Sequence, residues 1–209
     1  MSGSPLRVGV LASGAGTNLQ AILDRVHGRD GVEVVAVGSD RADAQALERA
    51  AVAGVPNAVF GVGEHGGDRL ARDAAMAGWL EGAQVGLVVL AGYMQLLSPA
   101  FLARFEDRVV NVHPALLPAF PGIRSVEQAL AYGVKVFGVT VHFVDEGVDS
   151  GRIISQRAIE LPAATEPDEV REALRPLEHE LLCAAVTLIA RGAVRPDPDH
   201  PRRVLVASG

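Results

Sequence analysis

The sequence predicts an α/β protein built on a single doubly wound, mostly parallel sheet. Short apolar runs alternate with segments of about 10–15 residues in which apolar side chains recur at helical spacing, and this alternation is typical of parallel sheets covered by helices. Apolar residues make up 49% of the 209 residues, which is enough for a full core. Since no linker divides the chain, we expect one domain over residues 1–209, with a core from about residue 6 to residue 191 and a polar C-terminal tail over 192–209.

The first part of the chain supplies most of the expected strands and helices. Nearly continuous apolar runs, which suit strands buried on both faces, predict strands at 6–12, 32–38, 57–60, 85–91 and 108–112. Apolar residues at helical spacing predict helices after residue 18 and over 42–53 and 70–80. Ser98 and Pro99 predict the start of another helix, because serine caps helices and proline is tolerated at the first helical position.

The pattern changes after a proline- and glycine-rich stretch over 113–122. Strand-like runs at 134–144 and 153–159, joined by an acidic loop, predict an extension of the sheet that can include an antiparallel edge. Residues 165–168 resemble a capping box and predict the start of the longest helix, which continues to about residue 190. The remaining residues are polar and rich in proline, apart from a short apolar run at 204–206.

Composition narrows the class of protein. The net charge is −6 and Lys135 is the only lysine, so we expect no nucleic-acid partner, because nucleic-acid binders carry a basic stripe. No run approaches the ~20 apolar residues of a membrane span, and the start of the chain has no signal-peptide stretch, so we expect a cytoplasmic protein without a membrane partner. The single cysteine, Cys183, lies in an apolar helical stretch and is expected to be a buried thiol. The six histidines show no metal-ligand spacing, so no metal is expected.

A glycine-rich segment, Ser-Gly-Ala-Gly-Thr-Asn at 13–18, lies where the first expected strand passes into the first helix. Glycines allow a sharp turn, and free N–H groups at a helix start can bind an anion. The spacing is not a dinucleotide fingerprint, because Leu19 occupies the third glycine position, and no Gly-Lys-Ser/Thr follows. Two interpretations stay open: a turn without a ligand, or a phosphate monoester site to which Thr17 and Asn18 add side-chain donors.

Asn111 and His113 lie at the end of the strand expected at 108–112. Residues two apart on a strand share a face, and Pro114 keeps the chain extended at His113. Ligands of open α/β sheets bind beyond the carboxyl ends of the strands, where an amide and an imidazole together could stabilise an oxyanion and transfer a proton. The alternative is that the two polar side chains only shape a loop.

Three acids, Asp145, Glu146 and Asp149, lie in the loop between the last two expected strands of the sheet. They form either a solvated hairpin turn or a site in which one carboxylate faces His113, favours its imidazolium form and orders a water. Sequence spacing does not choose among the three.

Four segments together resemble the phosphoribosylglycinamide formyltransferase family, purine-pathway enzymes that use 10-formyltetrahydrofolate. They are Ser-Gly-Ala-Gly-Thr-Asn-Leu-Gln at 13–20, Leu-Ala-Gly-Tyr-Met at 90–94, Asn-Val-His-Pro-Ala-Leu-Leu-Pro at 111–118 and Val-His-Phe-Val-Asp-Glu-Gly-Val-Asp-Ser-Gly at 141–151. The resemblance runs from about residue 7 to residue 191, in the family's order and at compatible spacing. It implies the family's Rossmann-like α/β fold.

The resemblance also implies roles for individual residues. Asn111, His113 and Asp149 match the family's catalytic positions, which favours Asp149 among the three acids. The residues that match ribonucleotide-binding positions are Gly16, Thr17, Asn18, Arg175 and Glu178, although Arg175 and Glu178 could instead form a salt bridge on the helix surface. The residues that match folate-lining positions are Arg69, Met94, Gln95, Leu96, Leu97, Asn111, Asp145, Glu146, Gly147, Val148 and Asp149.

The implied activity is transfer of a formyl group from the co-substrate 10-formyltetrahydrofolate to the amine of 5′-phosphoribosylglycinamide, with small-molecule partners only and without a metal. We expect a monomer or a homodimer. The alternatives are a formyltetrahydrofolate hydrolase, a methionyl-tRNA formyltransferase-like enzyme, or a non-catalytic domain that binds a phosphate ligand. The first two normally carry an additional domain.

The chain departs from the family pattern at four positions. Gln95 stands where arginine is common, Ala119 where lysine is common, and Arg124 and Val126 where histidines often occur. These departures concern the folate-lining positions and the loop over 113–124, and they leave Asn111, His113 and Asp149 unchanged.

Overall fold

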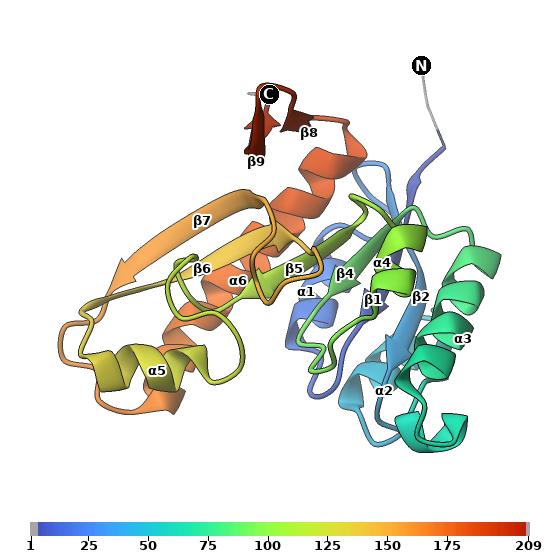
Figure 1. Cartoon of the computed structure of the whole chain (residues 1–209), viewed down its shortest axis with the longest axis horizontal. Helices are drawn as coiled ribbons and strands as arrows, with labels where there is room; N and C mark the ends of the chain where they lie inside the picture. Colours follow the sequence, from blue (N-terminus) through green and yellow to red (C-terminus); the bar gives the residue numbers. More distant parts are fainter. Residues whose placement is uncertain (1–3, 208–209) are drawn as a thin grey trace. The chain divides into compact units, whose positions relative to one another are not determined.

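The computed structural model describes residues 4–207 (Figure 1). These residues form two compact units, and the boundary between the units lies between Val110 and Asn111. Seven strands form one sheet in the order β3-β2-β1-β4-β5-β6-β7, and β8 and β9 form a separate small sheet. The predicted fold class, an α/β protein with a mostly parallel sheet, is therefore confirmed. The single domain stays a prediction.

The first unit contains the parallel part of the sheet. Its strands are β1 (Leu6–Leu11), β2 (Val32–Ser39), β3 (Asn57–Val59) and β4 (Leu87–Leu90). β1 pairs in parallel with both β2 and β4, and β2 pairs in parallel with β3. All four residues of β4 are buried, as expected for a central strand covered on both faces.

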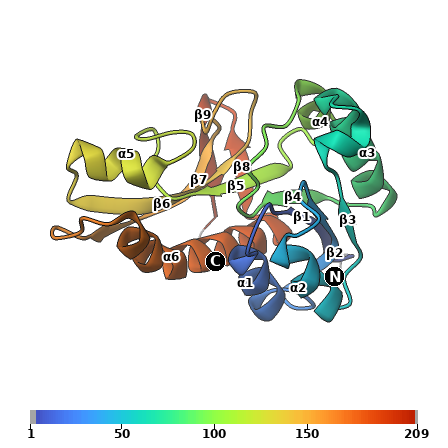
Figure 2. The same ribbon diagram turned by 90° about the horizontal axis from the view of Figure 1, so that it is seen from below.

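Helices cover both faces of this part of the sheet. They are α1 (Thr17–Arg25), α2 (Gln45–Val52), α3 (Arg69–Gly82) and α4 (Pro99–Arg104), with a short 3₁₀ helix η1 (Val62–His65) before α3. Figure 2 shows α1 and α2 on one side of β1 and β2, and α3 and α4 on the other side. Ser98 caps α4 by accepting a hydrogen bond from the Phe101 N–H, and Pro99 is at the first helical turn, which confirms the predicted helix start.

The second unit contains the antiparallel edge of the sheet. After β5 (Val109–His113) come α5 (Ser125–Tyr132), β6 (Val136–Phe143), β7 (Ile153–Glu160), α6 (Pro167–Ala190), β8 (Val194–Asp197) and β9 (His200–Val206). β6 and β7 pair antiparallel, so the expected antiparallel edge is confirmed. α6 runs along β6 and buries Val170, Leu174, Leu182 and Val186 (Figure 1).

Some local expectations differ from the structure. The capping box at 165–168 is wrong: Glu166 is the N-cap, its side chain makes no capping bond, and Pro167 begins α6. Helix α5 is absent from the sequence predictions because two turns are too short for a clear apolar period. The residues beyond 192 contain the hairpin β8–β9, whose turn is closed by the Asp199 N–H on Asp197 Oδ1.

One further expectation concerns a single residue. Cys183 is buried, as expected from its apolar surroundings in the sequence. Within residues 4–207 no helix is long and apolar enough to cross a membrane. In the same residues no group of three or more His, Cys, Asp or Glu side chains could hold a metal ion.

Candidate active site

The second unit brings Asn111 and His113, at the end of β5, into contact with Asp149. Asn111 Nδ2 lies 3.3 Å from Asp149 Oδ1, and His113 Nδ1 lies 3.3 Å from Asp149 Oδ2. Both side chains therefore reach the same carboxylate, as the two-residue period of a strand predicts. The other two acids of the loop, Asp145 and Glu146, are exposed.

The segment from Asp145 to Gly151, here called the acidic loop, holds Asp149 in a constrained backbone conformation. Asp149 has a φ of 49°, in the left-handed region that non-glycine residues rarely adopt. Asp145 Oδ1 accepts hydrogen bonds from the Gly147 N–H (3.1 Å) and the Ser150 hydroxyl (2.6 Å). Gly151 must be glycine, because a Cβ there would lie 1.8 Å from the Phe143 carbonyl oxygen. The loop is thus tightly folded on itself and against the end of β6.

Both ring nitrogens of His113 face hydrogen-bond acceptors. Nδ1 faces Asp149, and Nε2 lies 2.9 Å from the backbone carbonyl oxygen of Phe120. Only the imidazolium form can donate to both acceptors at once. The buried contacts of His113 therefore suit the protonated form that the sequence analysis expects beside a carboxylate.

His142, on β6, is a site residue that sequence reasoning missed. Its Nδ1 lies 2.7 Å from the Phe143 carbonyl oxygen, which accepts a hydrogen bond from it. Its Nε2 lies 3.3 Å from Asn111 Nδ2 and 3.5 Å from Asp149 Oδ1. The ring is only 1% exposed. A histidine in a buried strand whose only other polar residue is Thr140 is the signal that could have identified it.

The ionised form of Asp149 is strongly favoured. Burial by itself would raise the pKa of the Asp149 carboxyl, but hydrogen bonds from His142 and the Gly122 N–H, with the charges of His113 and His142, outweigh it. The Gly122 N–H lies 2.7 Å from Asp149 Oδ2. The resulting pKa is about 2, below the ordinary value of 3.8. Asp149 is therefore a carboxylate throughout the physiological range.

This lowered pKa links stability to pH. A depressed carboxyl pKa stabilises the fold above the unfolded pKa of 3.8, and the stabilisation disappears as the pH falls towards 2. We expect the gap in unfolding free energy between the wild type and Asp149→Asn to shrink by roughly 1 kcal/mol between pH 6 and pH 3. Urea unfolding at the two pH values measures this gap. A gap that does not change with pH would contradict the assignment of this pKa.

The glycine-rich turn lies in the first unit and has a defined shape. Gly16 is the N-cap of α1 with a φ of 67°, and a Cβ on it would lie 2.8 Å from the Cα of Ala46. Arg49 on α2 supports the turn by donating to the Ala15 carbonyl oxygen (2.7 Å) and to Gln20 Oε1 (2.8 Å). The turn therefore needs glycine at position 16 for two independent reasons. Beside it is a cavity of about 330 Å³ lined by Ser13, Gly14, Ala15, Arg41, Asp43, Ala44 and Gln45.

The segment expected to line the folate pocket, Met94 to Leu97, is held by side chains of α3. Arg69 and Arg72 both donate to the Leu96 carbonyl oxygen, at 3.1 and 3.2 Å. Ser13 Oγ accepts a hydrogen bond from the Met94 N–H at 2.9 Å. The side chains of Met94 and Leu96 are exposed. The backbone of this segment is thus fixed, while two of its apolar side chains remain accessible.

A buried ion pair lies beneath this segment. Arg72 is fully buried, and its Nη2 lies 2.6 Å from Asp73 Oδ1. Asp73 Oδ2 also accepts the Ser98 N–H at 2.7 Å. Gln95 donates to Asp40 Oδ2 at 3.0 Å, and its Oε1 lies 3.4 Å from Arg72 Nη1. Gln95 is therefore part of a polar network with Asp40 and Arg72.

The remaining predicted site residues lie on α6, where Arg175 is exposed and Glu178 is partly buried. Two of the departures, Arg124 and Val126, lie at the start of α5. Arg124 is its N-cap, with a φ of 61°, and lies 3.9 Å from Glu127. Val126 is buried in the core. A histidine at Val126 would place a polar ring in that core.

Comparisons with known proteins identify the family. Residues 6–186 match the family described as formyl transferase, so the chain belongs to the formyl transferase family. A phosphoribosylglycinamide formyltransferase of Mycobacterium tuberculosis is 44% identical over 191 residues, which cover 91% of this chain and 88% of that protein. The crystal structure of glycinamide ribonucleotide transformylase 1 from Symbiobacterium toebii superimposes with a TM-score of 0.94 at 45% identity, covering 99% of this chain and 96% of the other. Within its family, the chain belongs with the phosphoribosylglycinamide formyltransferases.

A longer relative has a domain of the same kind. The trifunctional purine biosynthetic protein adenosine-3 of Drosophila pseudoobscura pseudoobscura is 40% identical over 192 residues. These residues cover 90% of this chain but 14% of that protein. The similarity therefore concerns one part of a larger enzyme.

Proposed function

We infer that this protein transfers the formyl group of 10-formyltetrahydrofolate to the amine of 5′-phosphoribosylglycinamide, a step of purine biosynthesis. The observation that carries this inference is that Asn111 and His113 both contact the carboxylate of Asp149, in a chain of the formyl transferase family. The roles of individual residues follow from the contacts described above.

His113 and Asn111 stabilise the negative charge that develops on the formyl oxygen during attack. A single well-placed donor of this kind contributes ~3 kcal/mol to lowering the barrier. In the described conformation the His113 Nε2–H faces the Phe120 carbonyl oxygen at 2.9 Å. The formyl oxygen therefore replaces Phe120 as the acceptor, and the 113–122 segment gives up this contact when the substrates bind.

Asp149 keeps His113 protonated and handles the transferred proton. The new bond joins the substrate amine nitrogen to the formyl carbon, and the bond that breaks joins this carbon to N10 of the folate. The amine loses one proton and N10 gains one, so the reaction consumes neither acid nor base overall. Asp149, with a pKa of about 2, is ionised and passes this proton through a water.

The ribonucleotide phosphate is bound by Gly16, Thr17 and Asn18. Gly16, the N-cap of α1, makes no side-chain capping bond, and the N-terminus of a helix suits an anion such as a phosphate. Arg175 and Glu178 on α6 contact the same substrate, and the exposed guanidinium of Arg175 suits its phosphate charge.

The folate is bound by Arg69, Leu97 and the acidic loop, together with three exposed apolar side chains, Met94, Leu96 and Val148. Exposed apolar side chains of this size suit the flat rings of a folate. Gln95 supports the Met94–Leu97 segment through Asp40 and Arg72 rather than contacting the folate directly. These residues thus fit a folate, with Gln95 in a supporting role.

The chain acts in the cytoplasm as a monomer or a homodimer. The buried single cysteine supports the first assignment, since thiols persist in a reducing compartment. Sedimentation velocity distinguishes the two oligomeric states.

The experiment that tests this function compares acceptors for the formyl group. Purified protein is incubated with 10-formyltetrahydrofolate and either the ribonucleotide or water alone, and tetrahydrofolate is followed by absorbance. We expect tetrahydrofolate to form only with the ribonucleotide. Equal release with water would favour the hydrolase, and formylation of charged methionyl-tRNA would favour the tRNA enzyme. Calorimetric binding of the ribonucleotide without any transfer would favour a non-catalytic domain.

Replacing Gly16 with valine tests the phosphate turn. The added side chain meets Ala46 and forces a β-branched residue into a left-handed conformation, so we expect the KM for the ribonucleotide to rise by roughly 10-fold or more. Gly14→Ala is the matched control, because a Cβ at Gly14 meets no atom within 4 Å. A folded Gly16→Val variant with an unchanged KM would support the turn without a ligand.

A further inference from the structure

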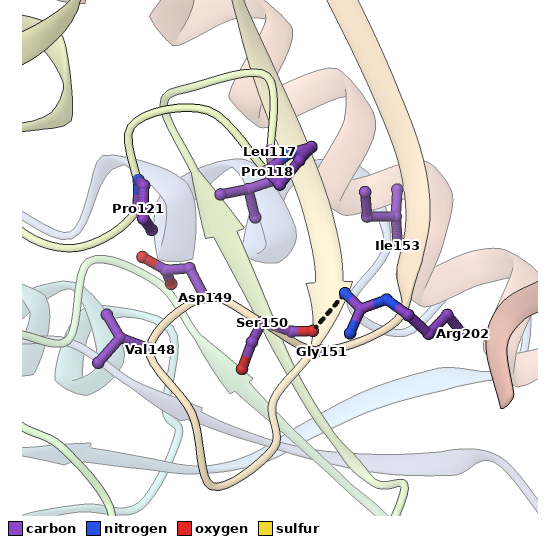
Figure 3. Close-up of a pocket in the computed structure, with 9 residues that line it drawn as sticks. All are labelled: Leu117, Pro118, Pro121, Val148, Asp149, Ser150, Gly151, Ile153 and Arg202. Atoms are coloured by element: carbon purple, nitrogen blue, oxygen red, sulfur yellow. Dashed lines mark hydrogen bonds between the residues drawn. The ribbon is translucent and has the colours of Figure 1, made fainter.

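The C-terminal hairpin contacts the acidic loop beside Asp149. Arg202, on β9, donates from Nη2 to the Ser150 carbonyl oxygen at 2.9 Å. Arg202 and Asp149 also line one cavity of about 350 Å³, together with Leu117, Pro118, Pro121, Val148, Ser150, Gly151 and Ile153. Figure 3 shows the Arg202 guanidinium reaching the carbonyl oxygen of Ser150, the residue after Asp149.

We propose that Arg202 is a positioning residue for formyl transfer, which holds the acidic loop in the conformation that aims Asp149 at His113. The proposal rests on the proposed function. It gives a role to the hairpin β8–β9, which supplies none of the residues that match the family's site positions.

The acidic loop needs support from outside. Asp149 is held at a φ of 49°, and such a conformation costs about 1 kcal/mol or more in a non-glycine residue. The residues from Asp145 to Val148 are exposed, so hydrogen bonds within the loop hold them rather than packing. A hydrogen bond to the Ser150 carbonyl fixes the Ser150–Gly151 peptide, one residue beyond Asp149.

The contacts of Asp149 are sensitive to small movements. Besides the Gly122 N–H at 2.7 Å, which is short, its oxygens lie at longer distances from the side chains of the site: 3.3 Å from Asn111 Nδ2, 3.3 Å from His113 Nδ1 and 3.5 Å from His142 Nε2. These side-chain distances are at the long end for hydrogen bonds, so a shift of about half an ångström breaks them. Because misplacement by about 1 Å can lower a rate by roughly 100-fold, a relaxed loop would slow the reaction.

The neighbouring residue provides a matched control. Arg203 carries the same charge on the same strand, but successive side chains of a strand point to opposite faces. Arg203 pairs with Asp197 inside the hairpin, 3.6 Å away, and its side chain is 61% exposed. Arg203→Met therefore removes a similar side chain without touching the acidic loop.

The experiment compares Arg202→Met and Arg202→Gln with the wild type and Arg203→Met. Glutamine keeps a donor for the Ser150 carbonyl and methionine does not, whereas the two side chains have similar size. We expect Arg202→Met to lower kcat by about 10-fold with little change in the KM for the ribonucleotide, and Arg202→Gln to recover most of kcat. Equal kcat values for Arg202→Met and Arg203→Met, or for the two Arg202 variants, would overturn the proposal.

A second readout needs no substrate. Carboxyl ¹³C NMR follows the titration of Asp149. We expect its pKa to move from about 2 in the wild type towards the ordinary value of 3.8 in Arg202→Met. An unchanged titration in Arg202→Met would also overturn the proposal. If the wild type transfers no formyl group but the Asp149 titration shifts as expected, the proposed function fails and the positioning by Arg202 stands.

Discussion

Replacing Asp149 with asparagine is expected to lower kcat by roughly 1,000-fold. Asn111, His113, His142 and the Gly122 N–H all approach this one carboxylate. An amide has no negative charge to favour the His113 imidazolium, and its NH₂ group would face one of these donors. The side chains have nearly the same size, so the loss concerns protonation and orientation rather than packing.

Steady-state formyl transfer measures this effect, with circular dichroism as a check of the fold. Glu146→Gln is the comparison variant, because Glu146 is an exposed acid of the same loop. We expect it to alter the KM for the folate and to spare kcat. If Asp149→Asn kept near-normal turnover, or if Glu146→Gln lost as much, the carboxylate assignment would be wrong.

Replacing Asp73 with asparagine is expected to lower the free energy of unfolding by about 3–5 kcal/mol. Arg72 is fully buried, and Asp73 is its partner at 2.6 Å. Without the carboxylate, the guanidinium charge stays in the core with no opposite charge in contact. The Ser98 N–H also loses a charged acceptor, so the backbone that follows the Met94–Leu97 segment loses support.

Urea unfolding measures this loss, and the KM for the folate should rise in the same variant. Glu81→Gln is the control, since Glu81 lies on α3 like Asp73 but forms an exposed ion pair with Arg104 of α4, and exposed pairs contribute little. A loss no larger than that of Glu81→Gln would mean that Arg72 finds another partner or reaches water.

The apolar runs of the sequence predict the parallel strands well, because each run lies within a few consecutive residues. β1 and β4 lie inside the expected ranges, β2 extends one residue past its expected end at 38, and β6 and β7 form the expected antiparallel edge. Short helices, and helix starts without a side-chain cap, are harder to find in this way. Helix α5 has only two turns, and the α6 start at Pro167 depends on backbone geometry rather than on a side-chain cap.

Local sequence also places Asn111 and His113 on one face, since the period of a strand is independent of the rest of the fold. The four motifs together also identify the family, and the comparisons with known proteins confirm it. The sequence leaves three acids as candidates by spacing alone, whereas the structure brings Asp149 to His113. This choice depends on the turn of the acidic loop, which Gly151 and the Phe143 carbonyl define.

By itself, then, the sequence determines the fold class, the family and the Asn-x-His pair, because each can be recognised from neighbouring residues or from motifs in a fixed order. Only the tertiary structure adds His142 to the site, joins Gln95 to Asp40 and Arg72, and brings Arg202 to Ser150. These contacts join residues 23 to 55 positions apart in the chain. No local pattern encodes such pairs, since they form only when strands and loops distant in sequence pack together.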